Sequence, residues 1–382
     1  MIDIQDKSRC SGCEACVQIC PRKCISCQTD SEGFVYPEVN HTECIECGLC
    51  EKVCHIFHPY DARIPIKTLA AKNIDEMIRV QSSSGGFFTA IAEKVIDDKG
   101  VVFGVKFDSH WMPVFSYTET KARLSDFRGS KYVQAKVRDA YIKCRTFLRQ
   151  DRNVLFCGTP CQISALYHFL GKRYDERLTT VDFVCHGVPS PCIWSDYLEK
   201  IQGNRDGDYI YPIKNVNFRD KSSSWSLFHF NLTTNGMTIN SPAWENPYMR
   251  AFLSNYSLRP SCYDCQVRNS RSSSDITMGD CWGIDRMIPD FSDDKGVSLL
   301  LINTLKGSLM VDGLALNTRN LSFKEVCENN SSIILNPKKP HKRGRFFTLL
   351  SAGKPLQTAN DMVHAVPFYQ KLLWSIRQRI HI

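Results

Sequence analysis

The chain has 382 residues, of which 43% are hydrophobic and 23% charged, a composition typical of globular proteins with two or three domains at a soft prior of ~150 residues each. It carries 19 cysteines, although a chain of this length can bury a core without covalent staples. The start, Met1–Asp6, lacks the features of a signal peptide, and no apolar run approaches the ~20 residues that span a bilayer. We therefore expect a cytoplasmic protein whose reduced cysteines bind metal.

The formal net charge of +8 is weak support for a nucleic-acid partner. An oxidised 4Fe–4S core with four thiolates adds about −2, so three clusters would bring the total to about +2. No nucleic-acid-binding motif is present either. The composition therefore favours metal over nucleic acid.

An internal repeat occupies residues 1–60. The runs Cys10–Cys20 and Cys44–Cys54 both read C-x2-C-x2-C-x3-C, which is typical of bacterial ferredoxins, in which the fourth cysteine of each run ligates the other cluster. We predict two 4Fe–4S clusters in an α+β ferredoxin-like module, and the spacing does not fit the alternative of two zinc sites. The predicted ligands are Cys10, Cys13, Cys16 and Cys54 for one cluster, and Cys44, Cys47, Cys50 and Cys20 for the other.

Three further residues of this module carry weaker signals. Cys24 and Cys27 are expected to pack as small hydrophobic side chains. His55 stands where a ferredoxin has a second proline, and a short strand is expected over 33–37.

Residues 61–150 and 151–335 are predicted to form the two parts of an α/β core, for which the family resemblance given below implies flavin binding. Strands are expected over 101–107, 153–156 and 178–184, and helices over 86–97, 163–170 and 193–201. Two cysteine-bearing turns, 157–162 and 185–191, follow the carboxyl ends of strands, where open α/β sheets bind ligands. Residues 336–382 form a basic tail with an amphipathic helix over 368–380, suited to a membrane surface or a partner, or to packing on its own domain.

Four motifs stand out in the predicted core. They are SSGGFF at 83–88, GTPCQ at 158–162, CHGVPSP at 185–191, and a C-x2-C pair at 262–265 that precedes DITMGDCWG at 275–283. Following the ferredoxin runs in this order, these motifs resemble those of the coenzyme F-420 hydrogenase/dehydrogenase beta-subunit family over roughly residues 1–345. The resemblance implies an iron–sulfur flavoprotein that binds FAD.

The resemblance also implies which residues hold the flavin, with connecting turns as the alternative. No G-x-G-x-x-G follows a strand, so direct use of NAD is disfavoured. The flavin candidates are Ser83, Ser84, Gly85 and Gly86 near phosphate or ribityl groups, then Gly129, Ser130, Lys131 and Tyr132, and Gly158, Thr159 and Gln162.

A third 4Fe–4S cluster is expected from the family motifs, held by Cys161, Cys185, Cys262 and Cys265. Zinc or plain packing are the alternatives, and Cys157 could replace one of the four. The cysteines expected only to pack are Cys144, Cys192, Cys281 and Cys327.

Polar residues beside these motifs are the catalytic candidates. His186 could relay a proton or orient its loop by hydrogen bonding. Asp280 and the run 219–221 are candidate polar groups of a substrate pocket, with ordinary solvated loop residues as the alternative.

The resulting expectation is an iron–sulfur, flavin-dependent oxidoreductase. It would pass electrons between clusters and FAD, act on a deazaflavin coenzyme or another organic substrate, and meet an electron-carrier protein or a redox partner subunit. Two alternatives remain open. One is an electron-delivery subunit for a partner enzyme, including one in surface-polysaccharide synthesis, and the other is a redox sensor with clusters but no flavin.

Overall fold

The computed structural model describes residues 1–171, 176–203 and 211–364. The amphipathic helix predicted over 368–380 lies outside these residues. Within the described ranges, no helix is both long and apolar enough to cross a lipid bilayer.

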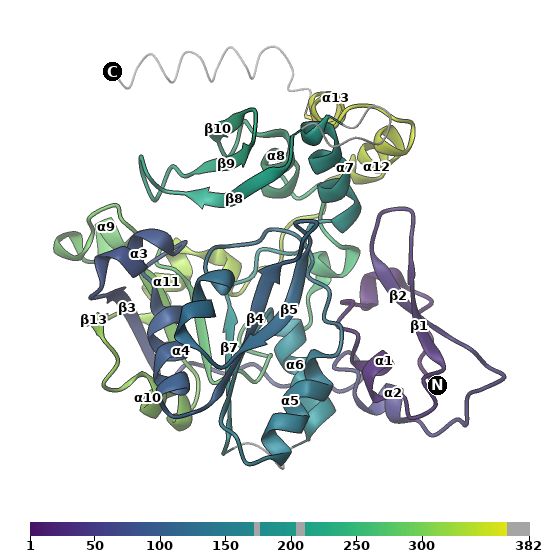
Figure 1. Cartoon of the computed structure of the whole chain (residues 1–382), viewed down its shortest axis with the longest axis horizontal. Helices are drawn as coiled ribbons and strands as arrows, with labels where there is room; N and C mark the ends of the chain where they lie inside the picture. The colour runs from purple at the N-terminus through teal and green to yellow at the C-terminus, as the bar shows by residue number, and fades with distance from the viewer. Residues whose placement is uncertain (172–175, 204–210, 365–382) are drawn as a thin grey trace.

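The first 60 residues form a small α+β module that lies at one side of the molecule (Figure 1). Its strands β1 (Ile25–Thr29) and β2 (Val35–Val39) pair antiparallel, so the predicted strand is present and begins two residues late. Its short helices are α1 (Ala15–Ile19) and α2 (Leu49–Lys52). Ile2, Cys24, Ile25 and Cys50 form its small buried core, so the cysteines themselves supply much of the packing.

The core of the protein is an eight-stranded mixed sheet in the order β13-β3-β12-β11-β7-β6-β4-β5. The pairs β4–β6, β6–β7 and β7–β11 are parallel and the outer pairs antiparallel. The α/β core is thus confirmed as a mixed rather than an all-parallel sheet. Its strands are β3 (Lys67–Asn73), β4 (Val101–Phe107), β5 (Pro113–Thr118), β6 (Val154–Cys157), β7 (Leu178–Phe183), β11 (Ile276–Asp280), β12 (Ser298–Ile302) and β13 (Leu316–Asn320).

Both faces of this sheet are covered, which explains its continuous apolar strands. In β12, Leu300 packs with helices α4 and α10 on one face, whereas Leu299 and Leu301 belong to a separate cluster on the other face. The helices around the sheet are α3 (Glu76–Gln81), α4 (Phe87–Asp97), α5 (Ala140–Arg149), α6 (Pro160–Leu170), α9 (Ile284–Met287), α10 (Leu305–Val311) and α11 (Phe323–Asn329).

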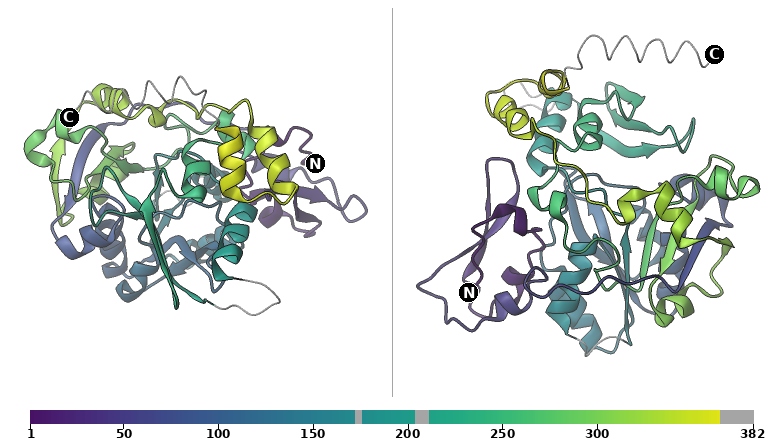
Figure 2. Two further views of the ribbon diagram at one scale, coloured as in Figure 1. Left: turned by 90° about the horizontal axis from the view of Figure 1, so that it is seen from above. Right: turned by 180° about the vertical axis from the view of Figure 1, so that it is seen from behind.

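A second lobe lies over one end of the sheet (Figures 1 and 2). Trp194, Phe230 and Phe346 are fully buried in its single hydrophobic cluster. It contains β8 (Ile213–Asp220), β9 (His229–Thr234), β10 (Thr238–Pro242), α7 (Pro191–Gln202), α8 (Pro247–Leu253), α12 (Arg343–Ser351) and α13 (Leu356–Val363). The last two helices come from the segment predicted to be a basic tail, so the described part of that segment packs on the lobe.

The module is fixed to the core at the first turn of α5. The Gln18 side chain accepts hydrogen bonds from the Tyr141 and Ile142 amides at 3.1 and 3.4 Å, and the Glu14 carboxylate accepts from the Val137 amide at 3.2 Å. The Tyr141 and Ile142 amides have no partner inside the helix, because the first turn of any helix leaves its N–H groups free. The module therefore completes the hydrogen bonding of a core helix.

A glycine is required where the module touches the second lobe. Gly33 has φ +85°, and a Cβ there would lie 2.3 Å from the Cys192 Cβ, whereas Gly48 has φ +70° and open space around it. We expect Gly48→Ala to cost only the left-handed backbone penalty of ~1–2 kcal/mol. Gly33→Ala should cost distinctly more free energy of unfolding, because it adds a clash with a packed neighbour. Equal urea midpoints for the two variants would contradict this close approach.

Candidate functional site

The predicted ligands of the first module cluster line one pocket: Cys10, Cys13, Cys16, Cys54. Cys27 lines the same pocket, although the sequence predicted only that it packs as a small hydrophobic side chain. Three of these ligands come from the first cysteine run and Cys54 comes from the end of the second run. The fold of the module, and not the spacing within one run, therefore brings them together.

The second set lines a separate pocket: Cys20, Cys44, Cys47, Cys50. Cys24 also lies there, with its sulfur 3.4 Å from the Cys20 sulfur. Cys47 is exposed and Cys50 is buried, so this pocket reaches the protein surface.

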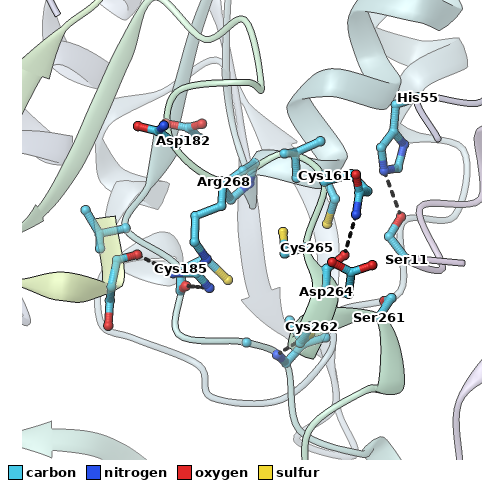
Figure 3. Close-up of a pocket in the computed structure, with 18 of the residues that line it drawn as sticks. Ser11, His55, Cys161, Asp182, Cys185, Ser261, Cys262, Asp264, Cys265 and Arg268 are labelled. Atoms are coloured by element: carbon cyan, nitrogen blue, oxygen red, sulfur yellow. Dashed lines mark hydrogen bonds between the residues drawn. The ribbon is translucent and has the colours of Figure 1, made fainter. Parts of the chain in front are cut away.

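The four core cysteines also line a single pocket: Cys161, Cys185, Cys262, Cys265. Figure 3 shows the sulfurs of Cys161, Cys185 and Cys265 directed toward the same space. Cys161 is the second residue of α6, Cys185 follows β7, and Cys262 lies in a 3-10 turn at Pro260–Asp264. Cys157, the suggested substitute, instead lines the large cleft described below.

The chemistry of the core pocket fits a metal cluster. Burial raises the pKa of the Cys161 thiol to about 11 and that of Cys262 to about 12, so thiolates at this position need a compensating cation. Among the described residues, no three His, Cys, Asp or Glu side chains converge on a single metal ion. The ligand shell of a four-iron cluster is wider, with sulfurs ~7 Å apart.

A cleft with an empty volume of about 1870 Å³, including open solvent, lies at the carboxyl ends of the parallel strands. Gly104 of β4 and Gly279 of β11 lie in its floor, and Arg219 and Phe252 of the second lobe line the opposite wall. Most of the flavin candidates line it: Ser83, Ser84, Gly86, Gly129, Ser130, Lys131, Tyr132, Gly158, Thr159 and Gln162.

Gly85 is the flavin candidate that does not line the cleft. A Cβ there would lie 2.3 Å from the Ala71 carbonyl and 2.5 Å from the Ser298 amide, so this glycine allows the loop to approach strands β3 and β12. In the same segment, the Ser83 hydroxyl accepts a hydrogen bond from the Ser130 amide at 2.7 Å. This contact joins the SSGG segment to the loop that carries Ser130. The SSGG segment therefore mixes structural and cleft-facing positions.

The other candidates combine a place in the cleft with a local structural role. The Gln162 side chain accepts from the Thr159 amide at 2.9 Å, which closes a cap at the start of α6. The Lys131 ammonium donates to the carbonyls of Arg128 and Gly129 at 3.0 and 3.1 Å, and burial lowers its pKa to about 8. Lys131 thus holds its own loop in shape.

His186 lines the cleft and is held by a neighbour. Its Nε2 lies 2.7 Å from the Asn255 Oδ1, and its ring meets Phe252 edge-on at 5.1 Å. Burial lowers the pKa of His186, which favours the neutral ring. This contact fits the loop-orienting alternative, and the proton-relay alternative stays a prediction.

Asp280 lies in the cleft as half of a buried ion pair. Its carboxylate is 2.5 Å from the Arg219 guanidinium, which is 4.1 Å from the Phe228 ring centroid and 5.2 Å from that of Trp282. Lys221, which belongs to the same run 219–221 as Arg219, donates to the Ser84 carbonyl at 2.8 Å and so supports the SSGG loop. The charged run 219–221 is therefore structural as well as close to the cleft.

The core cysteine pocket adjoins both the cleft and the first module pocket. The core cysteine pocket and the cleft share the wall formed by Val184, Cys185, Gly187 and Val188. The same cysteine pocket shares Ser11 and His55 with the first module pocket. His55 is buried, and its Nε2 lies 3.4 Å from the Ser11 hydroxyl. The sequence marked His55 only as a departure from proline and held no sign of this shared wall.

The Asp280–Arg219 pair gives a direct stability test. We expect Asp280→Ala to lower the free energy of unfolding by ~3–5 kcal/mol, because it leaves a buried guanidinium without its partner. The matched control is Asp97→Ala, which breaks the exposed pair with Lys121 and should leave stability nearly unchanged. Urea unfolding measures both, and equal small losses would show that Arg219 is compensated by other groups.

Comparison with known proteins agrees with the resemblance. Residues 68–140 match the N-terminal family model of the coenzyme F420 hydrogenase/dehydrogenase beta subunit, and residues 151–326 match its C-terminal model. An uncharacterized protein of Methanocaldococcus jannaschii is 26% identical over 263 residues, which cover 60% of this chain and 72% of that protein. A chain of the F420-reducing nickel–iron hydrogenase complex from Methanosarcina barkeri, in a xenon derivative, has a TM-score of 0.47 at 17% identity and covers 71% of this chain and 91% of that chain. This chain belongs to the coenzyme F420 hydrogenase/dehydrogenase beta-subunit family.

Proposed function

We propose that this protein is a cytoplasmic iron–sulfur, flavin-dependent oxidoreductase with three 4Fe–4S clusters and FAD. When bound, the clusters carry single electrons, and the flavin couples them to two-electron chemistry on a deazaflavin coenzyme or another organic substrate. The observation that carries the proposal is the grouping of the twelve predicted thiols, four to a pocket, with two of the three pockets joined by shared walls to each other and, through the core pocket, to the cleft.

The walls of the cleft suit a flavin. The amino terminus of α4 follows Gly86 at the cleft, and free N–H groups at a helix start favour phosphate. Phe88, Phe228 and Trp282 supply flat apolar walls. Ligand pockets commonly measure ~300–1,000 Å³, and the cleft, with a cavity volume of about 410 Å³, falls in this range.

The outer module pocket suits contact with an electron-carrier protein. Cys47 is exposed, and Ile45 in the same pocket is 60% exposed. An exposed apolar side chain beside a ligand gives a partner a contact point close to the metal. We infer that single electrons enter or leave at this end, and that the organic substrate binds at the cleft.

The cleft also separates this function from the alternatives. An electron-delivery subunit needs the cysteine pockets and a partner surface, but it has no use for a substrate-sized cavity. A redox sensor with clusters and no flavin leaves the cleft and its loops without a role. The oxidoreductase is therefore the function that the arrangement supports best.

Iron content tests the ligand sets. The full chain, reconstituted anaerobically, should bind about twelve irons, and Cys13→Ala, Cys47→Ala and Cys265→Ala should each remove about four. Cys13 is a better choice than Cys16, because Cys27 lies near Cys16 and could replace it as a ligand. Cys144→Ala is the control, since Cys144 is fully buried away from all three pockets. Zinc in place of iron, or an unchanged count in the Cys265 variant, would overturn the corresponding set.

Flavin retention tests the cleft. The protein should release FAD on denaturation, and Gly129→Val should weaken FAD binding by at least tenfold, because a side chain would occupy the cleft wall. Gly353→Val is the matched control: both glycines have positive φ, +80° and +75°, with no atom within 4 Å of a Cβ, but Gly353 is not among the cleft residues. Fluorescence titration with FAD measures both. A fully metallated protein that binds no FAD would favour the sensor.

A further inference from the structure

Arg259 is a fully buried arginine at the junction of the module and the core. Its guanidinium donates to the Cys10 carbonyl at 2.7 Å, the Val35 carbonyl at 2.8 Å and the Gln134 side-chain oxygen at 3.1 Å. It also lies 4.4 Å from the centroid of the Tyr36 ring. Every one of these partners is neutral, so the positive charge itself is not balanced by them.

No carboxylate in the described ranges lies within 4.0 Å of the Arg259 side chain. Glu14 is the acidic residue whose charge acts on Arg259, but it forms no ion pair with it, so it offsets the guanidinium charge only in part. By contrast, the buried Arg343 at the same junction pairs with Glu32 at 2.6 Å. A buried charge without a counter-charge costs several kcal/mol, so Arg259 requires an anion from another source.

The position of Arg259 identifies that source. Its side chain contacts the carbonyls of Cys10 and Val35, which both line the first module pocket. Its own chain continues into the turn that carries Cys262, and the Cys262 amide donates to the Arg259 carbonyl at 3.0 Å. The guanidinium therefore lies between the first module pocket and the core cysteine pocket.

Its side chain also reaches the walls of both pockets. A Cβ on Gly12, which lies between Cys10 and Cys13 in the first module pocket, would be 2.6 Å from an Arg259 nitrogen. Gln134, which accepts from Arg259, donates to the Ser11 carbonyl at 3.1 Å, and Ser11 lines both pockets. A 4Fe–4S core with four thiolates carries a net charge of about −2 when oxidised and about −3 after it accepts one electron. Two such groups on either side of Arg259 supply the anion that the protein around it lacks.

We propose that Arg259 is the shared counter-charge of the first module cluster and the core cluster, and that it sets their reduction potentials. This inference rests on the proposed function, because it needs both clusters. The added electron comes from a one-electron carrier and stays on the cluster, and no bond in the protein forms or breaks. A fixed positive charge in a dry interior stabilises the more negative, reduced form, so it makes both clusters easier to reduce.

The test is an anaerobic redox titration of the full chain, followed by electron paramagnetic resonance and visible absorption. Arg259→Gln should move two cluster potentials to more negative values and leave the third, that of the exposed outer cluster, unchanged. Arg259→Lys keeps the charge while losing part of the hydrogen bonding, and its potentials should stay close to those of the wild type. Arg343→Gln is the matched control, since it removes a buried junction arginine that has its own carboxylate, and it should move no potential.

The outcomes separate charge from structure. Potentials that are unchanged in Arg259→Gln with full iron content would overturn the proposal, as would a shift of equal size in Arg259→Lys. Should Arg259→Gln lose iron, Arg259→Lys decides: retained clusters with wild-type potentials support the proposal, and loss of iron there as well overturns it. Wild-type protein without clusters would refute the proposed function itself, which is a different result from clusters whose potentials ignore Arg259.

Discussion

The attachment of the cysteine-rich module to the core is the interaction on which the rest of the arrangement depends. The Gln18 side chain takes up amides at the start of α5, and the Glu14 carboxylate takes up the Val137 amide just before it. Arg259 crosses in the opposite direction to the Cys10 carbonyl. Each contact satisfies a group that its own domain leaves unpaired, so the two domains are incomplete without one another. Because this docking places Ser11 and His55 in the wall of the core cysteine pocket, the module pocket and the core pocket adjoin.

The parallel strands at the centre of the sheet determine where the cleft lies. Strands β6, β7 and β11 run in the same direction, so the segments that follow them meet at one edge. The segment after β7 serves two sites at once: Cys185 belongs to the core cysteine pocket, and His186 lines the cleft. One short loop therefore forms the partition between the proposed cluster and the proposed flavin. The lobe above the sheet then closes the cleft with Arg219 and Phe252.

The sequence predicted what is local and missed what is distant. The C-x2-C-x2-C-x3-C runs place three thiols on one loop, and the strand over 101–107 follows from its apolar residues, so both were found without a structure. The core thiols come from segments up to about a hundred residues apart, and only the family motifs grouped them. Arg259 reaches Cys10 across 249 positions of the chain, and no spacing can signal such a contact. Gly85 shows the reverse case: it belongs to a predicted cofactor motif, but its structural reason is the close approach of the loop to strands β3 and β12.

The outer module pocket and the core cysteine pocket differ in their exposure to solvent, and this difference gives a reason for a fixed positive charge near the core pocket. The outer pocket opens to solvent at Cys47, and water there can stabilise the extra negative charge of a reduced cluster. The four core cysteines are half-buried, and desolvation raises the pKa of the Cys161 thiol. Burial alone would make the proposed core cluster the hardest to reduce, and electrons would not reach the proposed flavin. In the proposed arrangement, the charge of Arg259 would stabilise the reduced core cluster as water does at the surface, so that it could accept an electron from the exposed cluster. The buried guanidinium of Arg259 and the proposed core cluster therefore have to be considered together, because either charge buried alone would lower the stability of the protein.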